Sequence, residues 1–161
     1  MESPVPTLAE LTDSYVNGAA QLRAAVAGMS TEQIEARPIA GKWSTLEVVA
    51  HLADFEPIIA ERMKRTIALT KPLILGADEN EFAKFLAYDK RILSEELDLI
   101  DAVRRQMARV LRNIPDATLQ KTCVHSERGL LNLQQLLTTA IGHVTHHLAF
   151  IVEKKKSLGI A

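Results

Sequence analysis

Four long stretches of this chain carry apolar residues at helical spacing, and proline or glycine marks the segments between them. In residues 7–29, for example, Leu8, Leu11 and Tyr15 recur every three or four positions, which predicts one buried helical face. Valine and isoleucine are scattered through these patterns, and no run alternates with period two for long. The spacing therefore predicts an all-α chain, and four helices of this length favour an up-down four-helix bundle.

Two capping boxes predict helix starts in the first half of the chain. The box at residues 30–33 starts a short helical turn, which Pro38 stops. The box at residues 44–47 starts a helix that is expected to run to about Leu69. Pro57 lies inside this helix and removes one backbone donor, so a kink is expected there.

The second half of the chain carries two further helices. The third is expected to begin at Phe82 or Tyr88 and to end at about Arg112, before Pro115. The last is expected to run from about Asn132 to about Lys156, with residues 115–131 forming a loop before it.

Length and charge limit the classes of function. The 161 residues suit a single domain spanning 1–161. A formal net charge of -1 argues against a surface that follows nucleic-acid phosphates. The single cysteine excludes an internal disulfide, and the first residues lack a basic and apolar secretory pattern, so a cytoplasmic protein is expected.

One uncharged stretch is long enough to span a bilayer. It runs from Gly129 to Val152 but contains asparagine, glutamine, threonine and histidine side chains, each costly in hydrocarbon. The stretch is therefore interpreted as an amphipathic helix of a bundle, and no membrane partner is expected.

The histidines are the main candidates for functional residues in this sequence. His143 and His147 are four residues apart on the inward side of the last helix, so both rings can share one metal ion. The alternative is a pair of imidazoles hydrogen-bonded within a polar layer of the core. His51, near the start of the second long helix, is a third candidate ligand, although a partly buried histidine at a helix edge is the alternative. Three imidazoles with a fourth position for water are typical of a catalytic metal site.

Two blocks of sequence resemble the DinB-like (damage-inducible) superfamily. Residues 41–44 (GKWS) followed by 47–54 (EVVAHLAD) are similar to its second-helix signature, and residues 129–137 with 143–148 (HVTHHL) are similar to its fourth helix. The resemblance covers nearly the whole chain. It implies a four-helix bundle, often a homodimer, whose metal ligands match His51, His143 and His147 and whose metal is typically zinc or nickel.

The same resemblance implies a range of activities. Some relatives are transferases or isomerases that use mycothiol or bacillithiol, others are called metal-dependent hydrolases, and many have no assigned reaction. We therefore expect a divalent-metal-binding protein that acts on a small molecule as a hydrolase or as a low-molecular-weight-thiol transferase. The alternatives are a non-catalytic metal- or ligand-binding stress-response module and a purely structural helical protein.

Other titratable residues are weaker candidates. Asp54, one turn after His51, is a candidate catalytic residue that would orient a ligand or accept a proton from bound water, although a solvated helix residue is the alternative. Cys123 and His125 in the expected loop are candidates for metal ligands or for a nucleophile and base, but a small buried thiol and a surface histidine are favoured. His146 is expected to face solvent.

Overall fold

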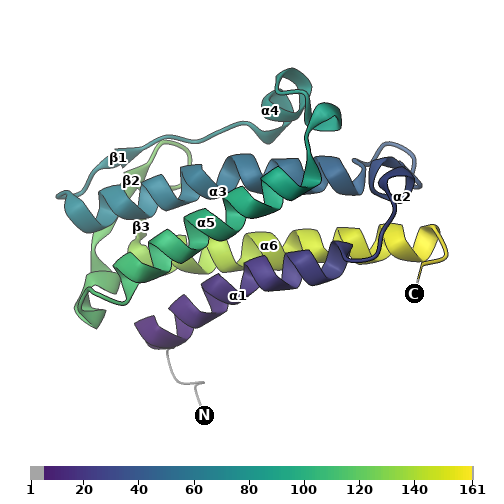
Figure 1. The fold of residues 1–161 in the computed structure, drawn as a ribbon. Coiled ribbons are helices and arrows are strands. Elements are labelled where there is room, and N and C mark those ends of the chain that lie inside the picture. The colour runs from purple at the N-terminus through teal and green to yellow at the C-terminus, as the bar shows by residue number, and fades with distance from the viewer. Residues whose placement is uncertain (1–5, 161) are drawn as a thin grey trace, which may run out of the picture.

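Four long helices form a bundle in the computed structural model, which describes residues 6–160 (Figure 1). They are α1 (Leu8–Val26), α3 (Thr45–Ala68), α5 (Leu93–Leu111) and α6 (Leu133–Ser157). Both α1 and α3 pack against α5 and against α6, which places α1 and α3 at opposite corners. The expected four-helix bundle is therefore confirmed.

The helices do not simply alternate in direction along the chain. Arg23 at the end of α1 pairs with Asp98 near the start of α5, so these two helices are antiparallel. Lys64, late in α3, donates to Gln106, late in α5, so α3 and α5 run in the same direction (Figure 1). The reason is the connection formed by residues 69–92, which carries the chain back along α3 before α5 begins. The bundle therefore contains neighbouring helices that are parallel as well as antiparallel ones.

The connection replaces part of a predicted helix. It holds three short elements, which are β1 (Leu73–Ile74), α4 (Glu79–Phe85) and the 3-10 turn η1 (Tyr88–Lys90). The prediction that a helix begins at Phe82 or Tyr88 is wrong for the long helix, because α5 begins at Leu93. Ala87 adopts the left-handed region with φ 50, which interrupts helical geometry, and Arg91 after the 3-10 turn is extended.

A small sheet lies where a loop is expected. After the 3-10 turn η2 (Asp116–Gln120), the strands β2 (Thr122–His125) and β3 (Gly129–Asn132) form an antiparallel hairpin, and β1 pairs with β2 in parallel. The side chains of β2 alternate between the two faces, so Cys123 and His125 both face inward and are buried. The buried thiol is confirmed, but the expected surface position of His125 is wrong, because the strand turns it into the protein.

Helix starts follow the capping motifs. Both predicted boxes are formed, at Ser30 before α2 (Thr31–Glu35) and at Ser44 before α3, and Asn132 caps α6 in the same way. Helix α3 continues through Pro57 to Ala68 without a break, and the kink at Pro57 stays a prediction. Local hydrogen bonding therefore determines where these helices begin.

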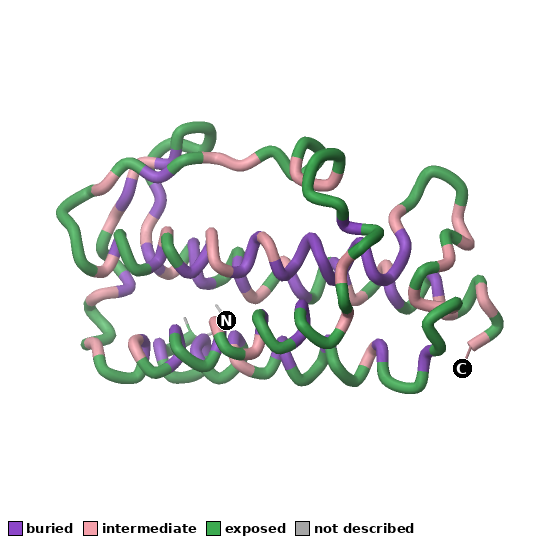
Figure 2. The backbone as a smooth tube through the Cα atoms, turned by 45° about the horizontal axis from the view of Figure 1, so that its top comes forward, coloured by how far each residue is buried: buried purple, intermediate pink, exposed green. Residues whose placement is uncertain are grey.

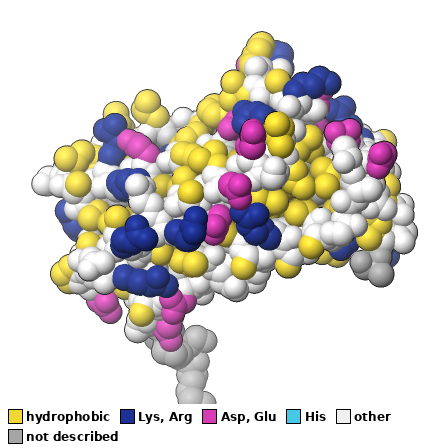
Figure 3. All heavy atoms as spheres, in the orientation of Figure 1, with side chains coloured by type: hydrophobic (Ala, Val, Ile, Leu, Met, Phe, Trp, Pro, Cys, Tyr) yellow, Lys and Arg dark blue, Asp and Glu magenta, His cyan; other side chains and the backbone are white. Residues whose placement is uncertain are grey.

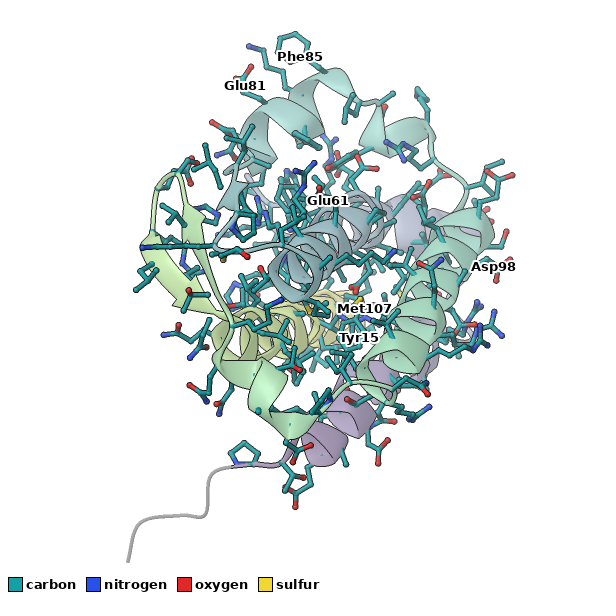
Figure 4. The ribbon with its side chains drawn as sticks, turned by 90° about the vertical axis from the view of Figure 1, so that its left-hand side faces the viewer. Tyr15, Glu61, Glu81, Phe85, Asp98 and Met107 are labelled. Carbon is teal, nitrogen blue, oxygen red and sulfur yellow. The ribbon has the colours of Figure 1, made fainter. Side chains whose placement is uncertain are left out.

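The core is apolar along the inward side of each helix. Figure 2 shows buried residues concentrated on α3 and on the inward faces of the other helices. In Figure 4, Tyr15 and Met107 point into the bundle, whereas Asp98 points away from it, and Glu81 and Phe85 project from α4. Figure 3 shows charged side chains of both signs along α1 and α5, with hydrophobic side chains gathered below α4. Within residues 6–160, no helix is long and apolar enough to cross a membrane.

A buried polar network joins the four helices at one level. Arg104 on α5 donates from Nε and Nη2 to Glu56 Oε2 on α3, at 2.9 and 2.8 Å. Its Nη1 donates to the Tyr15 carbonyl on α1 at 2.6 Å, and its Nη2 donates to the Ala140 carbonyl on α6 at 3.1 Å. Gly18 leaves room for this guanidinium, because a Cβ atom there would overlap Arg104 Nη1. The network fixes how the four helices face one another.

Candidate metal centre

Three imidazoles meet between α3 and α6. The ring centroids of His51 and His143 lie 4.9 Å apart, those of His51 and His147 lie 4.7 Å apart, and those of His143 and His147 lie 4.9 Å apart. His51 Nε2 and His143 Nε2 are separated by 2.9 Å. One nitrogen of each ring lies within 4.8 Å of the other two, so the structure brings all three predicted ligands together.

The helices position these rings from two sides. His143 and His147 are one turn apart and project from the same face of α6, and His51 faces them from the second turn of α3. The buried network lies close by along both helices, since Glu56 follows His51 by five positions and Ala140 precedes His143 by three. Arg104 bonds to both of these network residues, so it sets the separation between the helices that carry the histidines.

Aromatic side chains hold the rings in place. The His51 ring lies 5.3 Å from Trp43 and 4.6 Å from Phe55, measured between ring centroids. Phe55 in turn contacts Phe82 of α4 at 5.3 Å. On α6, the Phe150 ring lies 5.5 Å from that of His147. The site is therefore packed between apolar rings, which exclude water from its inner side.

Burial keeps the three imidazoles neutral. Burial, together with the charge of a neighbouring imidazole, lowers the pKa of His51 to about 3 and that of His147 to about 3. The pKa of His143 is lowered to about 4 by burial and by His51. At neutral pH each ring is therefore uncharged, which is the form of histidine that binds a metal.

Hydrogen bonding explains only part of this cluster. The His51–His143 contact accounts for two ring nitrogens, but the buried Nδ1 atoms of all three rings have no hydrogen-bond partner among residues 6–160. A hydrogen-bonded polar layer would give each ring a partner, so this alternative fits the structure poorly. Three neutral nitrogens that converge on one point match the donor set and spacing of a mononuclear site with three histidine ligands.

A cavity of about 410 Å³ opens onto this cluster. Its walls come from the loop before α3, from the start of α4 and from α6. His143 and His147 line it directly, and Trp43 and Phe150 supply aromatic wall. A small molecule in the cavity would therefore meet two of the three imidazoles, and this volume is typical of small-molecule sites.

Glu79 is a site residue that the sequence did not reveal. Its Oε2 lies 3.9 Å from His51 Nε2, its side chain is 56% exposed, and it lines the cavity. Its carboxylate is not part of the group of ligand atoms that lie within 4.8 Å of one another, so it stands beside the three nitrogens. No motif marks Glu79, because only the path of the connection brings the first residue of α4 over the site.

Asp54 is placed outside the group of imidazoles. Its two carboxylate oxygens accept hydrogen bonds from Arg91 at 3.2 and 3.1 Å, and Arg91 also donates to Glu96. The side chain is half-buried in this ion-pair network at the start of α5. Asp54 therefore links α3 to the end of the connection that carries Glu79.

The remaining histidines and the cysteine lie apart from the cluster. Cys123 and His125 belong to β2, and His125 Nδ1 accepts a hydrogen bond from the backbone N–H of Glu127 at 3.2 Å. Burial lowers the pKa of His125, as does the positive charge of Arg62. His146 is exposed as predicted, although its ring lies 5.2 Å from that of His147 at the rim of the cavity.

Known proteins share this sequence and fold. Residues 15–151 match the model of the DinB superfamily. The chain is 30% identical over 141 residues to a protein of Bacillus licheniformis, covering 86% of this chain and 79% of that protein. It is 29% identical over 130 residues to a protein of Oceanobacillus iheyensis, covering 81% of this chain and 75% of that protein. Both relatives are named as candidate metal-dependent hydrolases.

A solved structure has the same fold. YfiT from Bacillus subtilis superposes with a TM-score of 0.90 at 22% identity, covering 100% of this chain and 94% of that chain. YfiT is described as a candidate metal-dependent hydrolase with an unusual four-helix bundle topology. At this identity the likeness concerns the fold alone.

Proposed function

The chain belongs to the DinB superfamily, and on that premise we propose that it is a metal-dependent enzyme whose divalent ion is held by His51, His143 and His147. The observation that carries the proposal is the convergence of three neutral imidazoles at the floor of a cavity. Three protein ligands with an open side are typical of catalytic metal sites, whereas structural sites are closed by a fourth protein ligand. The open cavity thus favours an enzyme over a non-catalytic binding module.

The reaction class that we propose is hydrolysis of a small molecule. A bound divalent metal supplies Lewis-acid chemistry, because it lowers the pKa of a water towards neutrality or holds a small thiol as thiolate. The names of the relatives support hydrolysis. Transfer of a low-molecular-weight thiol is the second candidate, and the sulfur would then come from the cofactor, because Cys123 is buried in β2. Imidazole ligands suit both zinc and nickel.

Residues around the three histidines accept the proton, exclude water and position the site in this proposal. Glu79 is the proton acceptor in this proposal, because its carboxylate stands beside the three nitrogens and also faces the cavity. Trp43 and Phe150 shield the reacting group from water. Asp54 acts as a positioning residue, since its ion pair with Arg91 anchors the chain that follows α4.

Metal analysis of untagged protein tests the first half of the proposal. We expect about one equivalent of zinc or nickel per chain after reconstitution, as one mononuclear site requires. His143→Ala should lose this metal, and His146→Ala, a matched control on the exposed side of α6, should retain it. Sub-stoichiometric metal that is unchanged in His143→Ala would contradict the site.

An activity screen tests the second half. Metal-loaded protein is assayed with small esters and amides, and separately with small thiols and electrophilic partners. His51→Ala is the control for activity that does not need the site. Turnover that persists in His51→Ala, or the absence of turnover in both panels, would refute the enzyme and favour a metal-binding module. The homodimer and the cytoplasmic location stay predictions, and light scattering tests the homodimer.

A further inference from the structure

A buried lysine lies on the same face of α6 as two of the histidines. Lys154 follows His147 by seven positions, which is two helical turns, and only 3% of the surface of Lys154 is exposed. It lines the same cavity as His143 and His147. Two turns of helix correspond to about 10 Å along the axis, so Lys154 and the imidazoles mark two ends of one cavity.

This lysine has no counter-ion in the protein. Its Nζ donates to the Phe150 carbonyl at 3.4 Å, and no carboxylate of residues 6–160 forms an ion pair with it. An ammonium group has three donors, and a buried charge without an opposite charge is costly. Burial accordingly lowers the pKa of Lys154.

The neighbouring carboxylates do not fill this role. Both oxygens of Glu47 accept hydrogen bonds from Arg37, and one of them also accepts from the Ser44 backbone N–H. Glu153 lines the cavity but pairs with neither Lys154 nor Lys42, a second cation that lines the cavity from the loop before α3. The two lysines therefore present positive charge to the cavity without a direct ion pair, although the carboxylates of Glu79 and Glu153 line the same cavity.

Stabilisation of the helix end does not explain the burial of Lys154. The last carbonyls of α6 are already bonded. The Leu158 N–H donates to the Lys154 carbonyl, and the N–H groups of Gly159 and Ile160 donate to the next two carbonyls. Lys156 lies in the same turn and is exposed, so it meets the helix dipole without being buried. Stabilisation of the helix end therefore leaves the burial of Lys154 unexplained.

We propose that the Lys154 end of the cavity binds an anionic group of the substrate, a carboxylate or a phosphate. The substrate would then be a small elongated anion, with its reactive group at the three imidazoles and its apolar body between Trp43 and Phe150. Lys42 also lines the cavity, and its positive charge acts on Lys154. The assignment of the reacting end rests on the proposed function, and the anion subsite itself does not.

Matched ligands test the subsite. Binding of hexanoate, of neutral hexanamide and of inorganic phosphate is measured by calorimetry, with both metal-free and metal-loaded protein. We expect the wild type to prefer hexanoate over hexanamide by at least about tenfold, as a charge-assisted hydrogen bond allows. Lys154→Met should reduce this preference to about one, while Lys154→Arg should keep most of it because the charge stays. Lys156→Met is the matched surface control and should behave as the wild type does.

The outcomes separate the subsite from the metal site. A preference for hexanoate that persists in Lys154→Met would overturn the proposal, and so would a preference that disappears when the metal is removed, because the carboxylate would then sit on the metal. Failure of every probe to bind would overturn it as well. If the wild-type protein binds no metal but metal-free protein still prefers hexanoate over hexanamide, the proposed function is refuted and the subsite is supported. Tighter binding of phosphate than of hexanoate would assign the subsite to phosphate esters. Thermal unfolding and metal content verify that each variant is folded.

Discussion

Replacement of Arg104 by methionine tests whether the buried network holds the bundle together. The variant removes four hydrogen bonds, two to Glu56 Oε2 and one each to the carbonyls of Tyr15 and Ala140. Glu56 is fully buried and would keep only the Tyr15 hydroxyl, which donates to its Oε1 at 2.5 Å. Breaking a buried ion pair from one side costs about 3–5 kcal/mol, because it leaves an uncompensated charge.

That loss is large for a chain of this size. A change of 1 kcal/mol shifts the Tm by about 2–4 °C in proteins of similar length, so Arg104→Met should lower the Tm by about 6–20 °C. Because Ala140 precedes His143 by one turn, the variant should also weaken metal binding. Thermal and urea unfolding of metal-free protein measure the first effect, and a metal titration measures the second.

Neighbouring substitutions make this experiment decisive. Arg105→Met is the matched control, since Arg105 is exposed and forms a surface pair with Asp101 at 3.4 Å, which contributes at most about 0.5 kcal/mol. The double variant Arg104→Met with Glu56→Gln removes both charges and should recover part of the stability. A loss in Arg104→Met no larger than that in Arg105→Met would refute the role given to the network.

Three further predictions concern packing, catalysis and pH. Gly18→Ala should lower the Tm because its Cβ would overlap Arg104, whereas Gly142→Ala, with no atom near the new Cβ, should raise the unfolding free energy by up to about 1 kcal/mol. Glu79→Gln should lower kcat and shift the pH profile of kcat while the metal content stays unchanged. An unshifted profile in Glu79→Gln would rule out Glu79 as the proton acceptor. Asp54→Asn should instead lower the Tm. In metal-free protein the imidazoles titrate at about 3 to 4 when folded, but at about 6.5 when unfolded, so the unfolded chain binds more protons between these values. The unfolding free energy should therefore fall as the pH is lowered below about 6.5, and less steeply in His143→Ala; an equal slope in both would contradict the neutral cluster.

Local signals were sufficient to predict the long helices, except for the start of α5. A capping box is read within four residues, and its hydrogen bonds form wherever the helix packs, so the start of α3 at Ser44 was predictable. The sheet depends instead on distant pairing, because β1 has two residues and Leu73 aligns with Val124. A strand of two to four residues is too short to show period-two alternation. The inward orientation of His125 was missed for the same reason.

The functional site was likewise predictable only in part from local sequence. The spacing of His143 and His147 is visible within one helix, whereas their meeting with His51 depends on how α3 packs against α6. Glu79 was missed because its position depends on the route of residues 69–92, which no local pattern records. In the sequence, Lys154 is one of three consecutive lysines at the end of the last helix, and only its burial in the folded chain distinguishes it from Lys156.

Because α3 and α5 are parallel, the segment that joins them lines the cavity, whereas other residues stabilise the bundle. A short hairpin between them would make the helices antiparallel, but the observed direction requires a return path along the outside of α3. That return path supplies Glu79 and Asn80 to the cavity, while Arg104, Glu56 and the core lie beneath it. Exchanges in residues 76–87 that keep Glu79 and Phe82 can therefore reshape the roof of the cavity without altering the metal ligands or the network below. In evolutionary terms, the return path can change while the four helices and the histidines stay the same, so one bundle can serve many substrates.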